Sequence, residues 1–221
     1  MFGFCVAAAM CVQALMGPTA VAQVSQMRVV VDAGHGGIDG GVVGVKSGAK
    51  ESDVNLTLAF LLKDRLTDAG FAVTMTRSTK EGLYGDTSRG FKRRDMEKRK
   101  QIVENASPLC VISIHQNFYP SSASRGAQVF YGSGKEQSRA LAESIQTELN
   151  GLYAEQGVKA RKTMSADYYM LRLSAPSVIV ECGFLSNPKD DALLSDPSFC
   201  AKIADGMTAG LLAHLENLAQ I

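Results

Sequence analysis

The sequence contains no tryptophan, only three histidines and almost no net charge. Its 221 residues carry 23 Lys and Arg against 22 Asp and Glu, which gives a formal net charge of +1. This balance offers no electrostatic reason to expect nucleic acid or an anionic membrane as the main partner, because both are bound through an excess of basic side chains. With so few histidines, each one can be considered individually.

Cysteine is sparse and irregularly spaced. The five cysteines form no Cys-x-x-Cys pair and stand at no zinc-ligand spacing from a histidine, which argues against a structural zinc site. Cys110 and Cys182 lie inside apolar runs, where a free cysteine behaves as a small hydrophobic residue. Three cysteines follow residue 26, and an odd number at irregular spacing is not a disulfide framework. We find no internal repeat and no low-complexity tract.

The first 26 residues differ from the rest of the chain. Residues 2–17 are almost wholly apolar and uncharged, and Ala20-Val21-Ala22 fits the small-x-small pattern that precedes a signal-peptidase cut. The apolar stretch is short for a membrane span and lacks the usual preceding Lys or Arg. We expect residues 1–26 to be a signal peptide or a membrane anchor of an exported protein, and residues 27–221 to form one catalytic domain.

Apolar runs typical of buried strands alternate with segments of helical periodicity. We expect strands at 27–32, 71–76, 109–114, 127–131 and 177–180, and helices at 51–69, 91–106, 135–149 and 198–215, with a short helix opening at Asn187-Pro188. The alternation indicates βαβ units. The sequence therefore predicts a single α/β domain, built on a mostly parallel twisted sheet with helices on both faces. Residues 151–173 follow no clear period.

Polar side chains that could bind a metal or transfer protons follow three of these strands. His35 lies in the glycine-rich turn after the first strand, His115 and Glu181 follow two later strands, and Glu51 opens a helix. Because the C-terminal ends of parallel strands share one edge of a sheet, we expect all four side chains to meet in one crevice. Two histidines and a carboxylate form a ligand set of catalytic zinc, with water in the fourth position. The remaining carboxylate could then move protons beside the metal.

Four ordered stretches carry a resemblance to a known family. They are Val-Val-Asp-Ala-Gly-His35-Gly-Gly, Glu51 with Asn55 one turn later, Ser113-Ile-His115-Gln-Asn117, and Val178-Ile-Val-Glu181-Cys-Gly-Phe-Leu-Ser-Asn187. From about residue 27 to residue 215 the chain resembles the zinc-dependent N-acetylmuramoyl-L-alanine amidases. The resemblance implies one zinc ion per chain, with the metal ligands at His35, Glu51 and His115 and the catalytic glutamate at Glu181.

The resemblance also implies a substrate and a mechanism. The substrate is a peptidoglycan glycan strand with its stem peptide, cut at the amide between the lactyl group of N-acetylmuramic acid and L-alanine. Zinc would polarise the lactyl carbonyl and activate water, while Glu181 takes the proton and passes it to the leaving nitrogen. We expect residues 151–173 to line the substrate groove.

Two details resemble one subgroup, the germination-specific amidases of endospore formers. The first is the pair of motifs His115-Gln-Asn117 and Glu181-Cys-Gly-Phe. The second is the N-terminal apolar segment without an added binding domain. This implies a role in making muramic-δ-lactam of the spore cortex, together with a partner lipoprotein. It also implies a location at the cell wall or at the outer face of the membrane, which for this subgroup is the forespore intermembrane space. Only 65 residues separate His115 from Glu181, fewer than in members with an autoinhibitory helix. We therefore expect no internal plug in the active site.

Two other functions stay open at this point. A zinc peptidase or aminoacylase acting on free peptides would share the metal ligands and require no sugar. A partner-dependent wall-binding protein would use the metal structurally, and a fourth protein ligand would favour that alternative. A nucleotide site is disfavoured, because Gly-His-Gly-Gly is neither a GxGxxG fingerprint nor a P-loop with its lysine.

Several residues near the motifs have two interpretations. The basic run of Arg93, Arg94 and Arg99 is either a solvated helix face or contains one arginine that binds a peptide carboxylate or a structural aspartate such as Asp95.

Other polar residues are not expected to act directly. We expect Asn55 and Asn117 to orient ligands. Because neighbours in a strand point to opposite faces, Cys182 should face away from the crevice if Glu181 faces into it. We expect His214, near the end of the last helix, to be a surface or partly packed residue and not a ligand.

Overall fold

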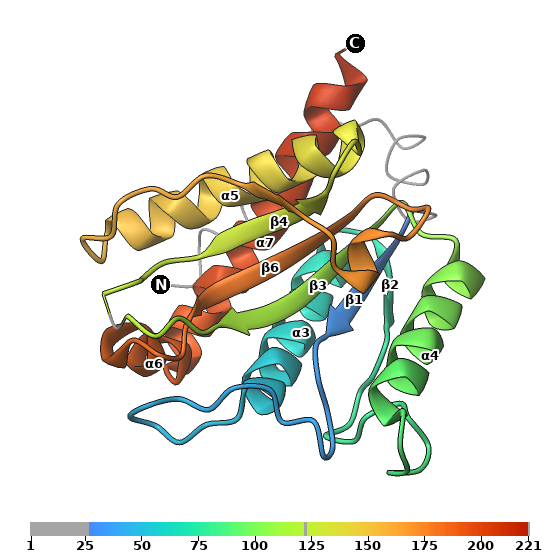
Figure 1. Cartoon of the computed structure of the whole chain (residues 1–221). Coiled ribbons are helices and arrows are strands. Elements are labelled where there is room, and N and C mark those ends of the chain that lie inside the picture. Colours follow the sequence, from blue (N-terminus) through green and yellow to red (C-terminus); the bar gives the residue numbers. More distant parts are fainter. Residues whose placement is uncertain (1–26, 122, 221) are drawn as a thin grey trace.

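The computed structural model describes residues 27–121 and 123–220. Its centre is a six-stranded sheet with the strand order β2-β1-β3-β6-β4-β5 (Figure 1). The strands are β1 (Arg28–Ala33), β2 (Ala72–Met75), β3 (Cys110–Asn117), β4 (Gln128–Gly132), β5 (Met164–Ala166) and β6 (Ser177–Phe184). All neighbouring strands are parallel except β4 and β6, which are antiparallel. The prediction of a mostly parallel sheet is confirmed.

Helices cover both faces of this sheet. They are α3 (Glu51–Asp68), α4 (Phe91–Ala106), α5 (Glu136–Ala154), α6 (Pro188–Leu194), α7 (Pro197–Ala219) and the short 3-10 helix η1 (Tyr169–Leu171). Helices α3, α5 and α7 pack together on one face, whereas α4 and η1 lie on the other (Figure 1). The predicted helix 91–106 has the bounds of α4. The predicted short helix at Asn187-Pro188 is α6, which begins with the Asn187 side chain accepting from the Lys189 N–H at 2.8 Å.

Alternation along the strands divides the interior into two cores. Val29 and Val31 of β1 point into the larger core beneath α3, α5 and α7, and Val30 points into the smaller core beneath α4 and η1. The same alternation continues to the C-terminal strand ends, where it places Asp32 of β1 and Glu181 of β6 on the α4 face. His115 and Glu181 therefore lie on the face with the smaller core, whereas Glu51 reaches the same edge from α3 on the other face.

Several elements differ from the sequence prediction. Strands β3 and β6 continue past their apolar runs, because their ladder still pairs His115 with Glu181. His115 and Glu181 consequently lie inside strands and not after them. Helix α5 extends five residues beyond the predicted end at 149, since Tyr153 is 2 % exposed and packs into the larger core. Residues 151–173 include the end of this helix, β5 and η1.

The predicted signal peptide or membrane anchor, residues 1–26, lies outside the described residues. Within 27–121 and 123–220, no helix has both the length and the apolar character needed to cross a membrane.

Candidate functional site

Three side chains from different elements converge at the C-terminal edge of the sheet. His35 follows β1, Glu51 is the first residue of α3, and His115 lies near the end of β3. Glu51 Oε1 lies 3.2 Å from His35 Nε2 and 3.1 Å from His115 Nδ1. The three donor atoms lie within 4.8 Å of one another, and no fourth His, Cys, Asp or Glu of the described ranges joins the group. Two imidazoles and a carboxylate at this spacing fit a catalytic zinc ion, which keeps one position open.

His35 reaches this place through a backbone conformation that few residues adopt. Its φ is 60°, in the left-handed region that costs non-glycine residues energy and is concentrated at functional sites. The preceding Gly34 is needed for a different reason, because a Cβ there would overlap the imidazole of His115. His35 Nδ1 lies 3.1 Å from Asp39 Oδ2. This is an ion-pair contact and not a hydrogen bond, because Nδ1 has no hydrogen-bond partner among the described residues, and Nε2 on the other side of the ring faces Glu51.

Two buried arginines hold the carbonyl groups of this turn. Arg99 donates to the carbonyls of Ala33 at 2.7 Å and His35 at 2.6 Å. Arg77 donates to the carbonyls of Ala33 at 2.9 Å and Gly34 at 3.0 Å. Buried carbonyls outside a ladder need such donors. The left-handed turn that carries His35 is therefore fixed by two guanidinium groups from distant parts of the chain.

The charge of Arg99 is balanced by Asp32 and Asp95. Arg99 Nη1 lies 2.6 Å from Asp32 Oδ1, and Arg99 Nε lies 2.5 Å from Asp95 Oδ2. Asp32 also accepts hydrogen bonds from Ser113 and Thr76, each 2.6 Å long. Burial by itself raises the pKa of Asp32, but the Arg99 charge and the two hydroxyl donors outweigh burial and lower this pKa to about 2. Asp32 is therefore ionised beneath the site.

These contacts decide between the two interpretations of the basic run on α4. Arg99 is the member that binds structural aspartates, and it is 1 % exposed. Arg93 lies toward solvent and pairs with Glu97, whereas the half-buried Arg94 pairs with Asp86 and donates to the carbonyls of Tyr84 and Arg89. The solvated-face interpretation is right for Arg93 and wrong for Arg99, and Arg94 binds the loop before α4.

Glu51 is buried and accepts hydrogen bonds on both carboxylate oxygens. The ladder between β3 and β6 is irregular after His115, which frees the Gln116 N–H to donate to Glu51 Oε1 at 3.1 Å. The Val42 N–H donates to Oε2 at 2.9 Å. Burial alone raises the pKa of Glu51, yet the imidazoles of His115 and His35 outweigh it and hold the pKa well below its usual range. The site therefore presents a fixed negative charge to a cation.

The two asparagines of the motifs make different contacts. Asn55 Nδ2 donates to the Gly34 carbonyl at 3.1 Å and lies 3.5 Å from Glu51 Oε1, so it links the turn to the carboxylate. Asn117 binds through its backbone carbonyl, which accepts from the Leu185 N–H at 3.0 Å. The contacts of Asn55 match the predicted orienting role more closely than those of Asn117.

Glu181 lies directly opposite His115 on the neighbouring strand, with its side chain on the same face. It is half-buried, and its Oε2 atom is buried without a hydrogen-bond partner in the part of the chain that the structure describes. Burial raises the pKa of Glu181 to about 7; His115 and His35 oppose this shift, and Glu51 adds to it. A carboxyl group with such a pKa can both accept and donate a proton near neutrality.

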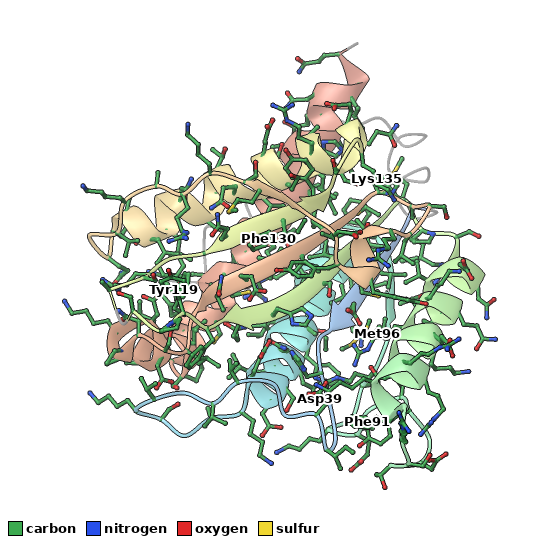
Figure 2. All side chains as sticks on the ribbon, viewed as in Figure 1. Asp39, Phe91, Met96, Tyr119, Phe130 and Lys135 are labelled. Carbon is green, nitrogen blue, oxygen red and sulfur yellow. The ribbon has the colours of Figure 1, made fainter. Side chains whose placement is uncertain are left out.

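A pocket of about 250 Å³ opens beside the three converging side chains on the α4 side. Its walls include Tyr84, Phe91 and Met96, and the ion pair between Lys92 and Asp39 lies at its rim, with 3.2 Å between the charged atoms. Figure 2 shows Asp39, Phe91 and Met96 on this side of the molecule. None of the lining residues belongs to 151–173. That segment was predicted to line the substrate groove, and it contributes nothing to this part of it.

A hollow of about 310 Å³ lies elsewhere, between α5 and α7. It is larger but contains no group of metal-ligating residues, so the chemistry belongs to the smaller pocket. His214 lines this hollow and is 6 % exposed. It is thus more buried than predicted, and it does not belong to the group of converging ligands.

The described cysteines are all free and buried. Cys182 points into the larger core, on the opposite face of β6 from Glu181, as predicted. Burial raises the pKa of its thiol well above the usual value, so Cys182 is not a nucleophile.

Sequence reasoning missed Arg77 and Asp39. Arg77 comes from the loop after β2 and reaches carbonyls more than 40 residues away. No local pattern marks such a contact. Asp39 stands four residues after His35, and a carboxylate so close to a candidate ligand was a usable signal.

Comparison with known proteins gives consistent results. The family model for N-acetylmuramoyl-L-alanine amidases matches residues 29–213. The germination-specific N-acetylmuramoyl-L-alanine amidase of Bacillus subtilis is 35% identical over 189 residues, which cover 84% of this chain and 78% of that protein. The N-acetylmuramoyl-L-alanine amidase AmiA of Escherichia coli is 27% identical, with 84% of this chain and 75% of AmiA covered.

A solved structure is similar as well. The CwlD amidase from Clostridioides difficile, in complex with the GerS lipoprotein, matches with a TM-score of 0.82 and 33% identity. The match covers 87% of this chain and 100% of that one.

Proposed function

The chain belongs to the N-acetylmuramoyl-L-alanine amidase family and hydrolyses the amide bond between N-acetylmuramic acid and L-alanine in peptidoglycan. We propose that it does so with one zinc ion held by His35, Glu51 and His115, and that Glu181 transfers the proton. The observation that carries the proposal is the convergence of two imidazoles and an ionised carboxylate beside a second carboxylate with an unpaired oxygen. A zinc ion bound there supplies Lewis-acid chemistry, polarising a carbonyl group and lowering the pKa of water.

Glu181 moves the proton in this proposal. Its unpaired Oε2 accepts a proton from the attacking water, and the same carboxyl group then delivers it to the departing nitrogen of L-alanine. A pKa of about 7 suits both steps, because the group gives up and regains the proton near neutral pH. The short distance across the strand pair from His115 to Glu181 keeps the carboxyl beside the ligands.

The remaining contacts keep the ligands in position. The Asp39 carboxylate lies beside Nδ1 of His35 without a hydrogen bond, so Nε2 is the nitrogen that faces the site. The backbone N–H groups of Val42 and Gln116 fix the Glu51 carboxylate. Arg99 holds the carbonyl of His35 itself. The ligands are thus supported by hydrogen bonds from several elements, as accurate metal sites require.

Glu181→Gln tests the role of the second carboxylate. We expect this variant to keep its zinc and to lose about 10²- to 10⁴-fold in the rate of stem-peptide release from peptidoglycan, because general acid–base catalysis contributes that much. Glu155→Gln, at an exposed glutamate that pairs with Lys202, is the matched control and should retain the wild-type rate. A zinc-loaded, active Glu181→Gln protein would remove Glu181 from the mechanism.

The two alternative functions make different predictions. A zinc peptidase or aminoacylase would cleave free stem peptides, whereas the amidase requires the muramic acid, so intact muropeptides and free stem peptides should be compared as substrates. A structural metal site in a wall-binding protein is disfavoured by the three-residue group within the described ranges, because structural zinc is usually closed by four protein ligands.

We propose further that the chain acts outside the cytoplasm in making muramic-δ-lactam of spore cortex, together with a partner lipoprotein. The names of two relatives support this: one is called germination-specific, and the other was solved in complex with the GerS lipoprotein. Export or membrane anchoring through residues 1–26 remains part of the proposal. Muropeptide analysis of cortex from a strain lacking the gene tests the first point, and loss of δ-lactam is the expected result.

A further inference from the structure

An arginine is bound to the residue that lies across from Glu181 on the neighbouring strand β4. Gln128 of β4 lies directly across from Glu181 of β6, and its side-chain oxygen accepts two hydrogen bonds from Arg161. Arg161 Nη2 donates at 2.8 Å and Arg161 Nε at 3.2 Å. The guanidinium also lies over the ring of Phe184, 5.1 Å from its centroid. A cation is therefore held on the β4 side of Glu181, one strand away from the carboxyl group proposed to move the proton.

Arg161 is half-buried and pairs with no carboxylate among the described residues. Its hydrogen bonds go to the Gln128 oxygen and, at 3.3 Å, to the backbone carbonyl of Arg125. A guanidinium has five N–H donors, so two remain for another acceptor. Asp190 is paired with Arg125 at 2.8 Å, and its charge also acts on Arg161 without an ion pair between them. Lys159 and Lys162 are exposed on either side of Arg161 in the sequence, so the local charge is positive.

The other buried arginines of the site lack this capacity. Arg99 is neutralised by two aspartates, and Arg77 directs its guanidinium at four backbone carbonyls. Arg161 is the arginine near Glu181 that combines partial burial, a rigid support and unused donors. A guanidinium held in this way is suited to bind a carboxylate with two parallel hydrogen bonds.

The stem peptide carries a carboxylate at a matching distance. Neighbouring strands lie about 4.8 Å apart, and with one hydrogen bond beyond Gln128 the guanidinium lies roughly 8 Å from Glu181. One extended residue spans about 3.6 Å, so the second residue of the leaving peptide lies roughly 7 Å from the scissile nitrogen. That residue is D-glutamate joined through its γ-carboxyl group, which leaves the α-carboxylate free.

We propose that Arg161, positioned by Gln128, binds the free α-carboxylate of the second stem-peptide residue and selects peptides that carry this carboxylate over peptides amidated there. The proposal rests on the proposed function, because it takes the stem peptide as the ligand. It assigns residues 158–163 to the substrate groove and places the peptide on the β4 side of Glu181. The pocket lined by Phe91 and Met96 is then left for the glycan strand.

A binding experiment tests the proposal without relying on turnover. The zinc-loaded full chain is titrated calorimetrically with the product peptide L-Ala-γ-D-Glu-diaminopimelate and with its counterpart amidated at the D-Glu α-carboxyl. We expect the wild-type protein to bind the carboxylate form more tightly. Arg161→Gln should weaken binding of that form about 10- to 100-fold and leave the amidated form nearly unchanged, since a charge-assisted hydrogen bond is lost only with the first.

Two further variants sharpen the result. Arg172→Gln removes an exposed arginine that already pairs with Asp167 at 2.7 Å, and it should leave both affinities unchanged. Arg161→Lys keeps the charge without the planar fork and should recover part of the discrimination. Equal loss of affinity for both peptides in Arg161→Gln, or no loss for either, would overturn the subsite.

Cleavage of the matching muropeptides separates this proposal from the proposed function. If muropeptides are cleaved but Arg161→Gln does not change the preference between them, the amidase mechanism stands and the subsite is wrong. If the peptides are discriminated through Arg161 while neither muropeptide is cleaved, the subsite stands and the proposed catalytic roles are wrong.

Discussion

Glu181 joins the catalytic proposal to the stability of the protein, because the burial that raises its pKa also makes its ionised form unfavourable. A carboxyl group whose folded pKa lies above its unfolded value of 4.5 stabilises the fold below pH 4.5, and this contribution is lost as the pH rises through about 7. The same environment that prepares the group for proton transfer therefore costs stability at neutral pH.

This leads to a prediction for zinc-free protein. Between pH 5 and pH 8 the wild type should lose on the order of 2 kcal/mol of unfolding free energy relative to Glu181→Gln, whose amide does not ionise. Urea unfolding at both pH values measures the difference. If the unfolding free energies of the two proteins change with pH in parallel, the pKa of Glu181 is not raised by folding and the prediction is wrong.

Asp32 makes the unfolding free energy depend on pH in the opposite direction. Its folded pKa of about 2 lies below the unfolded value of 3.8, so its contribution is present above pH 3.8 and is lost as the pH falls through about 2. We expect Asp32→Asn to lower the unfolding free energy by about 3 kcal/mol at pH 7, because Arg99 then lacks one of its two buried partners.

The control for Asp32→Asn is an ion pair on the surface of α4, the helix that carries Arg99. Glu97→Gln removes the exposed partner of Arg93 and should change stability by less than about 0.5 kcal/mol. Denaturant unfolding at pH 7 compares the two. Equal effects would mean that the buried network does not stabilise the turn beneath His35.

At the scale of the elements, two glycines inside helices have opposite roles. Gly210 of α7 lies against α5, and a Cβ there would come 2.6 Å from the Cα of Ile145. Gly151 of α5 has no atom within 4 Å of the corresponding position. The first glycine permits two helices of the larger core to approach, and the second serves no packing purpose.

The two alanine variants should therefore diverge. Gly151→Ala should stabilise the protein by about 0.5–1 kcal/mol, because alanine favours the helix over the unfolded chain. Gly210→Ala should destabilise it by about 1–3 kcal/mol, the usual cost of overpacking a core. Thermal unfolding measures both, and a stabilising Gly210→Ala would contradict the observed closeness of α5 and α7.

The elements also show how far the sequence predicts this fold. Dense β-branched runs such as Val29–Val31 mark their strands without ambiguity, since few other structures accommodate them. The strand β5 was not predicted, because three residues at the sheet edge carry no period of their own. Helix α5 continues past Gly151 because Tyr153 is buried against other elements, and this tertiary contact outweighs the local preference for a helix end.

The same distinction applies to the site. His35, Glu51, His115 and Glu181 were predicted together because strand ends and a helix start bring them to one edge of the sheet. Only part of their support was predicted, namely the orienting role of Asn55 and the pairing of an arginine with a structural aspartate such as Asp95. The contacts from Arg77 and Arg99 to the turn carbonyls depend on where a loop and a helix lie in space, and no spacing in the sequence encodes that position.

At the scale of the whole molecule, the sheet separates stability from chemistry. The larger core lies beneath α3, α5 and α7, whereas His115 and Glu181 lie at the edge of the other face, on which α4 and η1 pack (Figure 1). Glu51 joins them from the first turn of α3. Phe130 of β4 packs against this smaller core, whereas Tyr119 after β3 is exposed, and Figure 2 shows where both lie.

The central claim is that the amidase reaction depends on one zinc ion at His35, Glu51 and His115. We would measure zinc stoichiometry by native mass spectrometry and, in the same preparation, the release of stem peptides with a free L-alanine N-terminus from purified peptidoglycan. We predict about one zinc per chain, loss of release on chelation, and recovery when zinc is returned. Undiminished release from a preparation shown to contain no metal would contradict the account.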